Sequence, residues 1–132
     1  MERWLGRWSP QIYALFRIVV GLMFTMHGTQ KILGWPPGGH GAPDNPQMWV
    51  GAVIELVCGA LVLLGLFAGW AAFLASGEMA VAFFQFHAPS PKGPFPVQNE
   101  GDAAVLYCFA FLLIAARGAG IWSVQGPRSS GT

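Results

Sequence analysis

Charged side chains are scarce in this sequence. They make up 10% of the 132 residues, as seven Lys or Arg and six Asp or Glu, whereas about a quarter of an ordinary soluble domain is charged. Hydrophobic residues account for 54% of the chain, and so few charges could not cover that apolar surface in water. The composition indicates a membrane protein whose outer surface contacts the lipid bilayer. A formal net charge of +1 gives no indication of nucleic-acid binding.

Cysteines and metal-ligand spacings are also scarce. Cys58 and Cys108 lie inside apolar runs, where two inert buried thiols are favoured over a redox pair. The sequence contains no H-x-x-x-H or C-x-x-C spacing, so we predict no metal site. Haem or metal binding between His27 and His87 is retained as an alternative, because helix bundles do hold cofactors between facing helices.

Long apolar segments alternate with Pro- and Gly-rich breaks. They predict helices at about residues 11–33, 48–66, 70–86 and 100–116, each close to the roughly 20 residues that cross a bilayer core. The fold is therefore predicted to be all-α, an integral membrane antiparallel four-helix bundle forming a single domain over residues 1–132.

An even number of spans places both termini on one side of the membrane, and the tail from residue 121 is expected to fray. Four arginines lie near the predicted terminal side, namely Arg3, Arg7, Arg117 and Arg128. The excess of basic residues on cytoplasmic segments then predicts cytoplasmic N and C termini.

Several ionisable residues interrupt the apolar segments. Depth along each predicted helix places Arg17 and Glu78 together in the inner half, as an intramembrane ion pair. The same estimate predicts a polar pocket in the outer half, formed by His27, Lys31, Glu55, His87 and Glu100.

Two interpretations of these charges follow from their cost in a membrane. They could be structural ion pairs that fix helix order and register, or they could line a cavity that binds a ligand, a proton or an electron carrier.

The order and spacing of these residues resemble those of the DoxX family of small four-helix bacterial membrane proteins. The resemblance is carried by RIVVGLMFTMHGTQKILG from Arg17, ELVCGALVLLGL from Glu55, GEM at 77–79, NEGD at 99–102 and ARGAGIWS at 116–123. It implies a multi-pass inner-membrane protein associated with redox enzymes and able to interact with quinone, and it implies no catalytic residue.

The leading functional hypothesis is a redox-associated accessory subunit of the bacterial inner membrane. In it, a quinone or a small thiol or sulfur compound enters the outer pocket, His27 or Glu55 moves protons, and Lys31 holds an oxygen atom. The sequence has no evident cofactor signature, so electrons would come from a membrane or redox protein partner. The alternatives are a non-enzymatic scaffold or assembly subunit and a small transporter. Whether the chain is an enzyme, and its oligomeric state, are left open.

Overall fold

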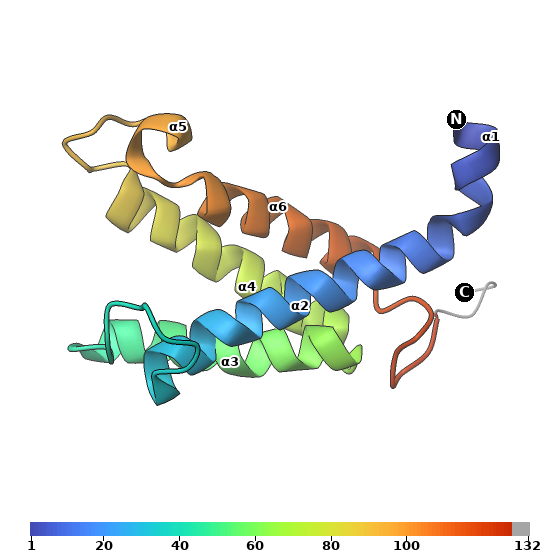
Figure 1. Cartoon of the computed structure of the whole chain (residues 1–132), viewed down its shortest axis with the longest axis horizontal. Coiled ribbons are helices and arrows are strands. Elements are labelled where there is room, and N and C mark those ends of the chain that lie inside the picture. The colour runs from blue at the N-terminus through green and yellow to red at the C-terminus, as the bar shows by residue number, and fades with distance from the viewer. Residues whose placement is uncertain (128–132) are drawn as a thin grey trace.

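The computed structural model describes residues 1–127, and over this range the chain is helical without strands. Its elements in order are α1 (Glu2–Leu5), the 3₁₀ turn η1 (Gly6–Trp8), α2 (Ser9–Leu33), α3 (Pro46–Leu64), α4 (Ala68–Ala82), the π-helical turn η2 (Phe83–His87), α5 (Pro96–Asn99) and α6 (Asp102–Arg117) (Figure 1). The all-helical prediction is confirmed. The long helices correspond to the predicted ones, although α4 begins at Ala68, before the predicted start near residue 70.

The long helices differ in whether they are long enough to cross a membrane. The continuous helical stretch Glu2–Leu33 and the helix Pro46–Leu64 are long and apolar enough to cross a bilayer. Helices α4 and α6 have 15 and 16 residues, which is shorter than the roughly 20 residues of a full span.

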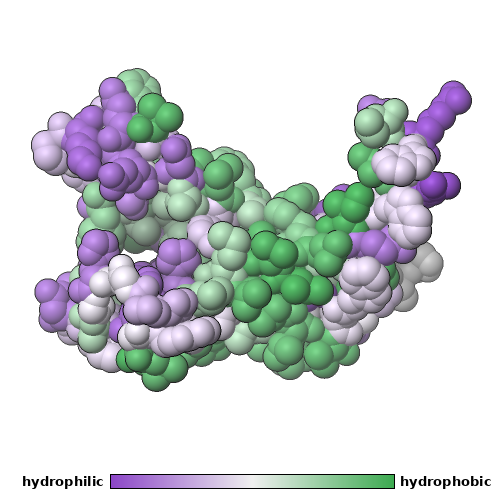
Figure 2. Space-filling model, viewed as in Figure 1, coloured by the Kyte–Doolittle hydropathy of each residue, from purple (hydrophilic) through white to green (hydrophobic). Residues whose placement is uncertain are grey.

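The outward faces of all the long helices are apolar. Large exposed apolar side chains include Ile12, Leu15, Val19 and Leu22 of α2, Val50, Val53 and Val57 of α3, Phe73, Leu74 and Val81 of α4, and Leu106, Phe109 and Leu113 of α6. Figure 2 shows an apolar band across the middle of the molecule, with polar residues gathered toward its ends. Such a surface is suited to lipid rather than to water.

The long helices pack as neighbours, α2 on α3, α3 on α4 and α4 on α6, while α2 and α6 touch little. Glycines set the closest of these approaches. A Cβ added at Gly21 or Gly28 would lie 2.5 Å from the backbone nitrogen of Leu63 or Leu56, and one at Gly59 would lie 2.6 Å from that of Thr25. Small residues at crossings are typical of packing between membrane helices.

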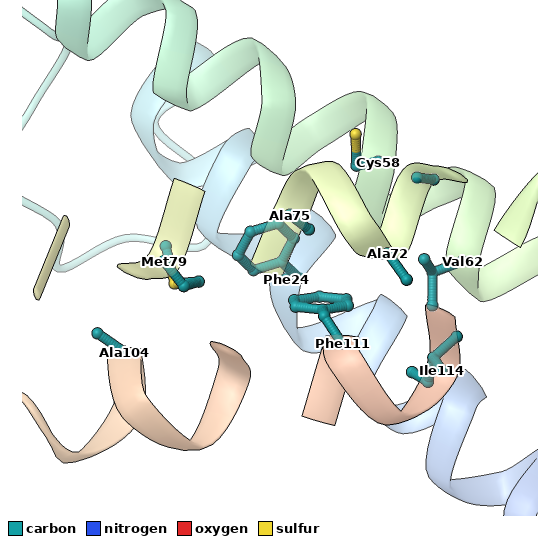
Figure 3. Close-up of a cluster of buried hydrophobic side chains, with 10 residues drawn as sticks. Phe24, Cys58, Val62, Ala72, Ala75, Met79, Ala104, Phe111 and Ile114 are labelled. Atoms are coloured by element: carbon teal, nitrogen blue, oxygen red, sulfur yellow. The ribbon is translucent and has the colours of Figure 1, made fainter. Parts of the chain in front are cut away.

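Side chains from all the long helices meet in one hydrophobic core. Phe24, Cys58, Val62, Ala72, Ala75, Met79, Ala104, Phe111 and Ile114 belong to it (Figure 3). The rings of Phe24 and Phe111 lie 4.6 Å apart, centre to centre, in an edge-to-face arrangement, which is a favourable geometry for aromatic pairs. This contact links α2 to α6 where their backbones stay apart.

The connecting segments divide the molecule into two ends. Residues 34–45 and 88–101 form what we call the loop end, and residues 1–8, 65–67 and 118–127 form the terminal end (Figure 1). At the loop end, Asn45 caps α3, because its Oδ1 accepts a hydrogen bond from the backbone N–H of Met48 at 2.9 Å. Figure 2 shows two polar lobes at this end with a notch between them.

Residues 118–127 fold back on the connection between α3 and α4. The N–H groups of Val124 and Gln125 donate to the carbonyls of Leu64 and Gly65 at 2.9 and 3.1 Å, and Gln125 accepts from the N–H of Ala68 at 3.2 Å. The expectation that the tail frays from residue 121 is therefore wrong up to residue 127. Residues 128–132, with Arg128, lie outside the described residues.

Candidate functional site

The predicted ion pair between Arg17 and Glu78 is not formed. The Arg17 side chain is fully buried, and it donates to the carbonyls of Val62 and Leu63, both at 2.8 Å, and to those of Ile121 and Trp122 at 3.3 and 2.6 Å. It therefore closes the carboxyl end of α3, where cations and donors are favoured, and holds the returning C-terminal segment. The sequence could not show these partners because they are backbone groups.

Glu78 lies instead toward the loop end. Its Oε1 faces Gly51, whose added Cβ would lie 3.1 Å away, and Gly51 lies one turn before Glu55 on the same face of α3. Because α4 starts at Ala68 rather than near residue 70, Glu78 sits about 3 Å deeper than estimated from the sequence. This shift moves Glu78 out of reach of Arg17 and into the predicted outer cluster.

Lys31 and Glu55 are brought together as an ion pair. Lys31 Nζ lies 2.7 Å from Glu55 Oε1, and the side chains are 39% and 4% exposed, respectively. The close approach of α2 to α3 at Gly28 positions both residues, since Gly28 lies one turn before Lys31 and against Leu56. A buried carboxylate next to a partly hydrated ammonium group is a stable arrangement only while both partners are present.

A tyrosine that the sequence analysis did not single out completes this cluster. Tyr107, on α6, lies close to Glu55, and its hydroxyl is buried. Within residues 1–127, three buried oxygen atoms at this place have no hydrogen-bond partner, namely Glu55 Oε2, Glu78 Oε2 and Tyr107 Oη. Buried polar atoms are normally paired, so a Tyr in an apolar run could have signalled a polar neighbour. We call Lys31, Glu55, Glu78 and Tyr107 the polar cluster.

His27 stands between this cluster and the surface. Its ring meets that of Tyr107 edge-on, with centroids 5.8 Å apart. The exposed side of His27 borders a depression of about 240 Å³, which is also lined by Met23, Met26, Gln30 and Pro36. The depression therefore lies on α2 and the loop that follows it, and His27 links it to Tyr107.

His87 and Glu100, which were predicted to share this pocket, lie apart from it. His87 Nδ1 is hydrogen-bonded to the carbonyl of Asn99 at 3.1 Å, and Glu100 forms an exposed ion pair with Lys92 at 3.3 Å. His87 follows Glu78 by nine residues, or about 13 Å along a helix, which carries it out to the loop end.

The remaining candidates have local partners. Within residues 1–127, no three His, Cys, Asp or Glu side chains converge as a metal-ligand set. Cys58 and Cys108 are both free thiols. Cys58 belongs to the hydrophobic core, and Cys108 Sγ lies 3.5 Å from Ser76 Oγ, which donates to the Cys108 carbonyl at 2.7 Å.

An apolar exterior, helices that cross at glycines and buried ionisable side chains together define a helical membrane protein. The sequence matches the DoxX family over residues 12–88, which is more than half of the chain. The protein therefore belongs to the DoxX family, as its sequence resemblance predicted. An uncharacterized protein of Haemophilus influenzae is 45% identical over 121 residues, covering 88% of this chain and 90% of the relative. No solved structure matches the chain.

Proposed function

We propose that this protein is a redox-associated accessory subunit of the bacterial inner membrane, and that it binds the ring of a quinone beside the polar cluster. In this proposal α2, α3, α4 with η2, and α6 cross the membrane as a four-helix bundle. Arg3, Arg7 and Arg117 lie at the terminal end, so the positive-inside rule places that end in the cytoplasm. The loop end then faces the opposite side.

The observation that carries the proposal is the set of polar groups at one depth among apolar helices. Ionisable side chains inside membrane segments are costly and commonly functional. Lys31 uses one donor on Glu55 and has two more, while the Tyr107 hydroxyl is buried without a partner within residues 1–127. A quinone presents carbonyl oxygens on a flat ring, and these groups could donate to such an oxygen.

The shape of the surface supports a ring with a lipid tail. The depression beside His27 measures about 240 Å³, below the roughly 300–1,000 Å³ typical of pockets that enclose a whole drug-sized ligand. It would hold a ring and leave the tail against the apolar faces of the helices. Met23 and Met26 supply adaptable apolar contacts there.

In the proposed electron transfer, this protein acts together with a membrane redox protein. Reducing quinone to quinol takes up electrons and protons together, and Glu55 and Glu78 are the groups placed to exchange those protons. The electrons come from a membrane redox protein, because this chain carries no flavin, haem or iron–sulfur signature.

Extraction of the purified protein tests this function. Protein isolated in mild detergent without added lipid is expected to carry quinone in near-stoichiometric amount, detected by mass spectrometry and absorbance. Tyr107→Phe and His27→Ala are expected to lose it, and Glu100→Gln, which changes an exposed loop residue, is expected to retain it. Folded wild-type protein that carries no quinone, and binds none when quinone is added, would contradict the proposal.

The contacts of Arg17 favour a second candidate, a scaffold or assembly subunit. This buried charge serves only backbone carbonyls of its own chain, so at least one intramembrane charge acts structurally. For a pure scaffold, quinone would be absent and a stable partner protein would co-purify, and that association would survive Tyr107→Phe.

A further inference from the structure

The polar cluster has an unbalanced charge. Lys31 neutralises Glu55 through the contact at 2.7 Å, which leaves the second carboxyl, that of Glu78, without a cation of its own. Glu78 Oε1 lies against Gly51, one turn before Glu55 on the same face of α3, so the two carboxyl groups are neighbours, and each has one buried oxygen without a partner within residues 1–127. Two ionised carboxylates at such a distance repel strongly where water is excluded.

We propose that Glu55 and Glu78 bind one proton between them, and that this shared proton makes the pair a proton-exchange site of the protein. The proton converts one carboxyl into a donor, so a single hydrogen bond pairs both carboxyl groups. It also brings the cluster to zero net charge. The inference goes beyond quinone binding, because the pair holds its proton whether or not a quinone is present.

This site differs from an exposed patch of acidic residues because Glu55 is buried. The Glu55 side chain is only 4% exposed, and its Oε2 faces the cluster without a partner in the described residues. A metal cation does not fit as well as a proton. Ca²⁺ takes about six to eight oxygen ligands and Mg²⁺ about six, whereas the cluster offers a few oxygens and already contains the Lys31 ammonium group.

Groups from every neighbouring helix face the carboxyl pair. Lys31 reaches it from α2 and contacts Glu55, Cys58 on α3 lies near Glu78, and Tyr107 approaches Glu55 from α6. The pair therefore has one cation, one thiol and one phenol as neighbours, and the proton is the missing positive charge.

An open groove lies between α3 and α4 beyond Glu78, toward the loop end. Gln47, Ala80, Val81, Phe84 and Gln85 line it, and its volume is about 600 Å³. Gln47 and Gln85 bridge its mouth by hydrogen bonds between their side-chain amides.

The spacing of residues on both helices leads from the groove to Glu78. Gln47 lies one turn from Gly51 on α3, Val81 lies three residues beyond Glu78 on α4, and Gln85 lies seven residues beyond Glu78 in η2. Gly51 presents no side chain against the Glu78 carboxyl. In this proposal, protons exchange with the pair from the side of this groove.

Infrared spectroscopy of the full chain in quinone-free detergent micelles tests the proposal. Exposed carboxyl groups are ionised at neutral pH. A carbonyl stretching band from a protonated carboxyl at this pH therefore indicates a carboxyl group that is shielded from water. We expect this band in the wild type at neutral pH, with a shift in heavy water and loss at high pH. Glu78→Gln and Glu55→Gln are each expected to lose it, because the remaining carboxyl then has Lys31 to itself. The control Glu100→Gln is expected to keep it.

The outcomes separate this inference from quinone binding. A wild-type spectrum without the protonated-carboxyl band at neutral pH would overturn the shared proton, even if quinone binds and even if a variant fails to fold. A band that persists in the folded Glu78→Gln and Glu55→Gln variants would assign the proton elsewhere and also overturn it. The band in quinone-free protein supports the proton site independently of the proposed redox role.

Discussion

Replacing Arg17 by Met should be among the most damaging changes in this protein. Its guanidinium group is fully buried and supplies hydrogen bonds at 2.6–3.3 Å to carbonyls of Val62, Leu63, Ile121 and Trp122. The Val62 carbonyl also accepts from the N–H of Gly65 at 3.1 Å, so it keeps a partner. The other three carbonyls lose the donor that Arg17 gives them.

The expected size of the effect follows from those three carbonyls. An unpaired buried acceptor costs about 1–3 kcal/mol, and water can reach the partly buried ones, so each counts near the low end. The expected loss in free energy of unfolding is therefore about 3–5 kcal/mol. Arg17→Lys should lose less, because it keeps the charge but not the planar fork of donors.

Two measurements check this prediction in mild detergent. Equilibrium unfolding gives the free energy, and trypsin cleavage after Arg117 reports release of the C-terminal segment, which should become faster in Arg17→Met. Arg7→Met is the matched control, since Arg7 is exposed at the terminal end and its change should stay within about 0.5 kcal/mol. If Arg17→Met unfolds like the wild type and its cleavage rate is unchanged, Arg17 does not hold this end together.

Five further single changes and one double variant test the packing and the ion pair by the same unfolding measurement. Lys31→Met and Glu55→Gln should each destabilise by about 2–4 kcal/mol, below the full cost of breaking a buried pair because Lys31 is 39% exposed. The double variant should lose less than the sum, and an additive result would mean that the two side chains are not coupled. Gly28→Val should lower the free energy of unfolding by at least about 2 kcal/mol, since its Cβ would lie 2.5 Å from the backbone of α3. Gly77→Ala is the control: a Cβ there has nothing within 4 Å, so the change should be neutral or stabilise by up to about 1 kcal/mol. Phe111→Ala should cost about 3–5 kcal/mol, because the ring is fully buried; a smaller loss would show that the core relaxes around it.

The sequence predicted those parts of the molecule that depend on patterns of residue type. Apolar runs and Pro-rich breaks located the long helices. Lys31 and Glu55 were expected together in the outer half of the bundle, and the structure places them 2.7 Å apart.

The sequence failed where an interaction depends on the rotation of a helix or on backbone groups. Depth alone suggested Glu78 as the partner of Arg17. The guanidinium group instead donates to backbone carbonyls, which every residue has and which a sequence therefore cannot identify as partners. Tyr107 was not singled out because its ring resembles its aromatic neighbours until its hydroxyl is found buried. Glu100 was assigned to the pocket from its place near a predicted helix start, and its pairing with Lys92 at 3.3 Å depends on the loop conformation.

The bonds of Arg17 also bear on the order in which the chain can be completed during synthesis. A ribosome delivers α2 and α3 to the membrane well before it has made residues 118–127. Until then the carboxyl end of α3 lacks the backbone bonds that Val124 and Gln125 supply, and Arg17 lacks the carbonyls of Ile121 and Trp122. The contacts at this end of α2 and α3 are therefore incomplete until residues 118–127 have been synthesised. A truncation that removes the segment from Gly118 onward would leave a membrane-inserted intermediate with its arginine only half engaged, which is the kind of species that quality-control proteases recognise.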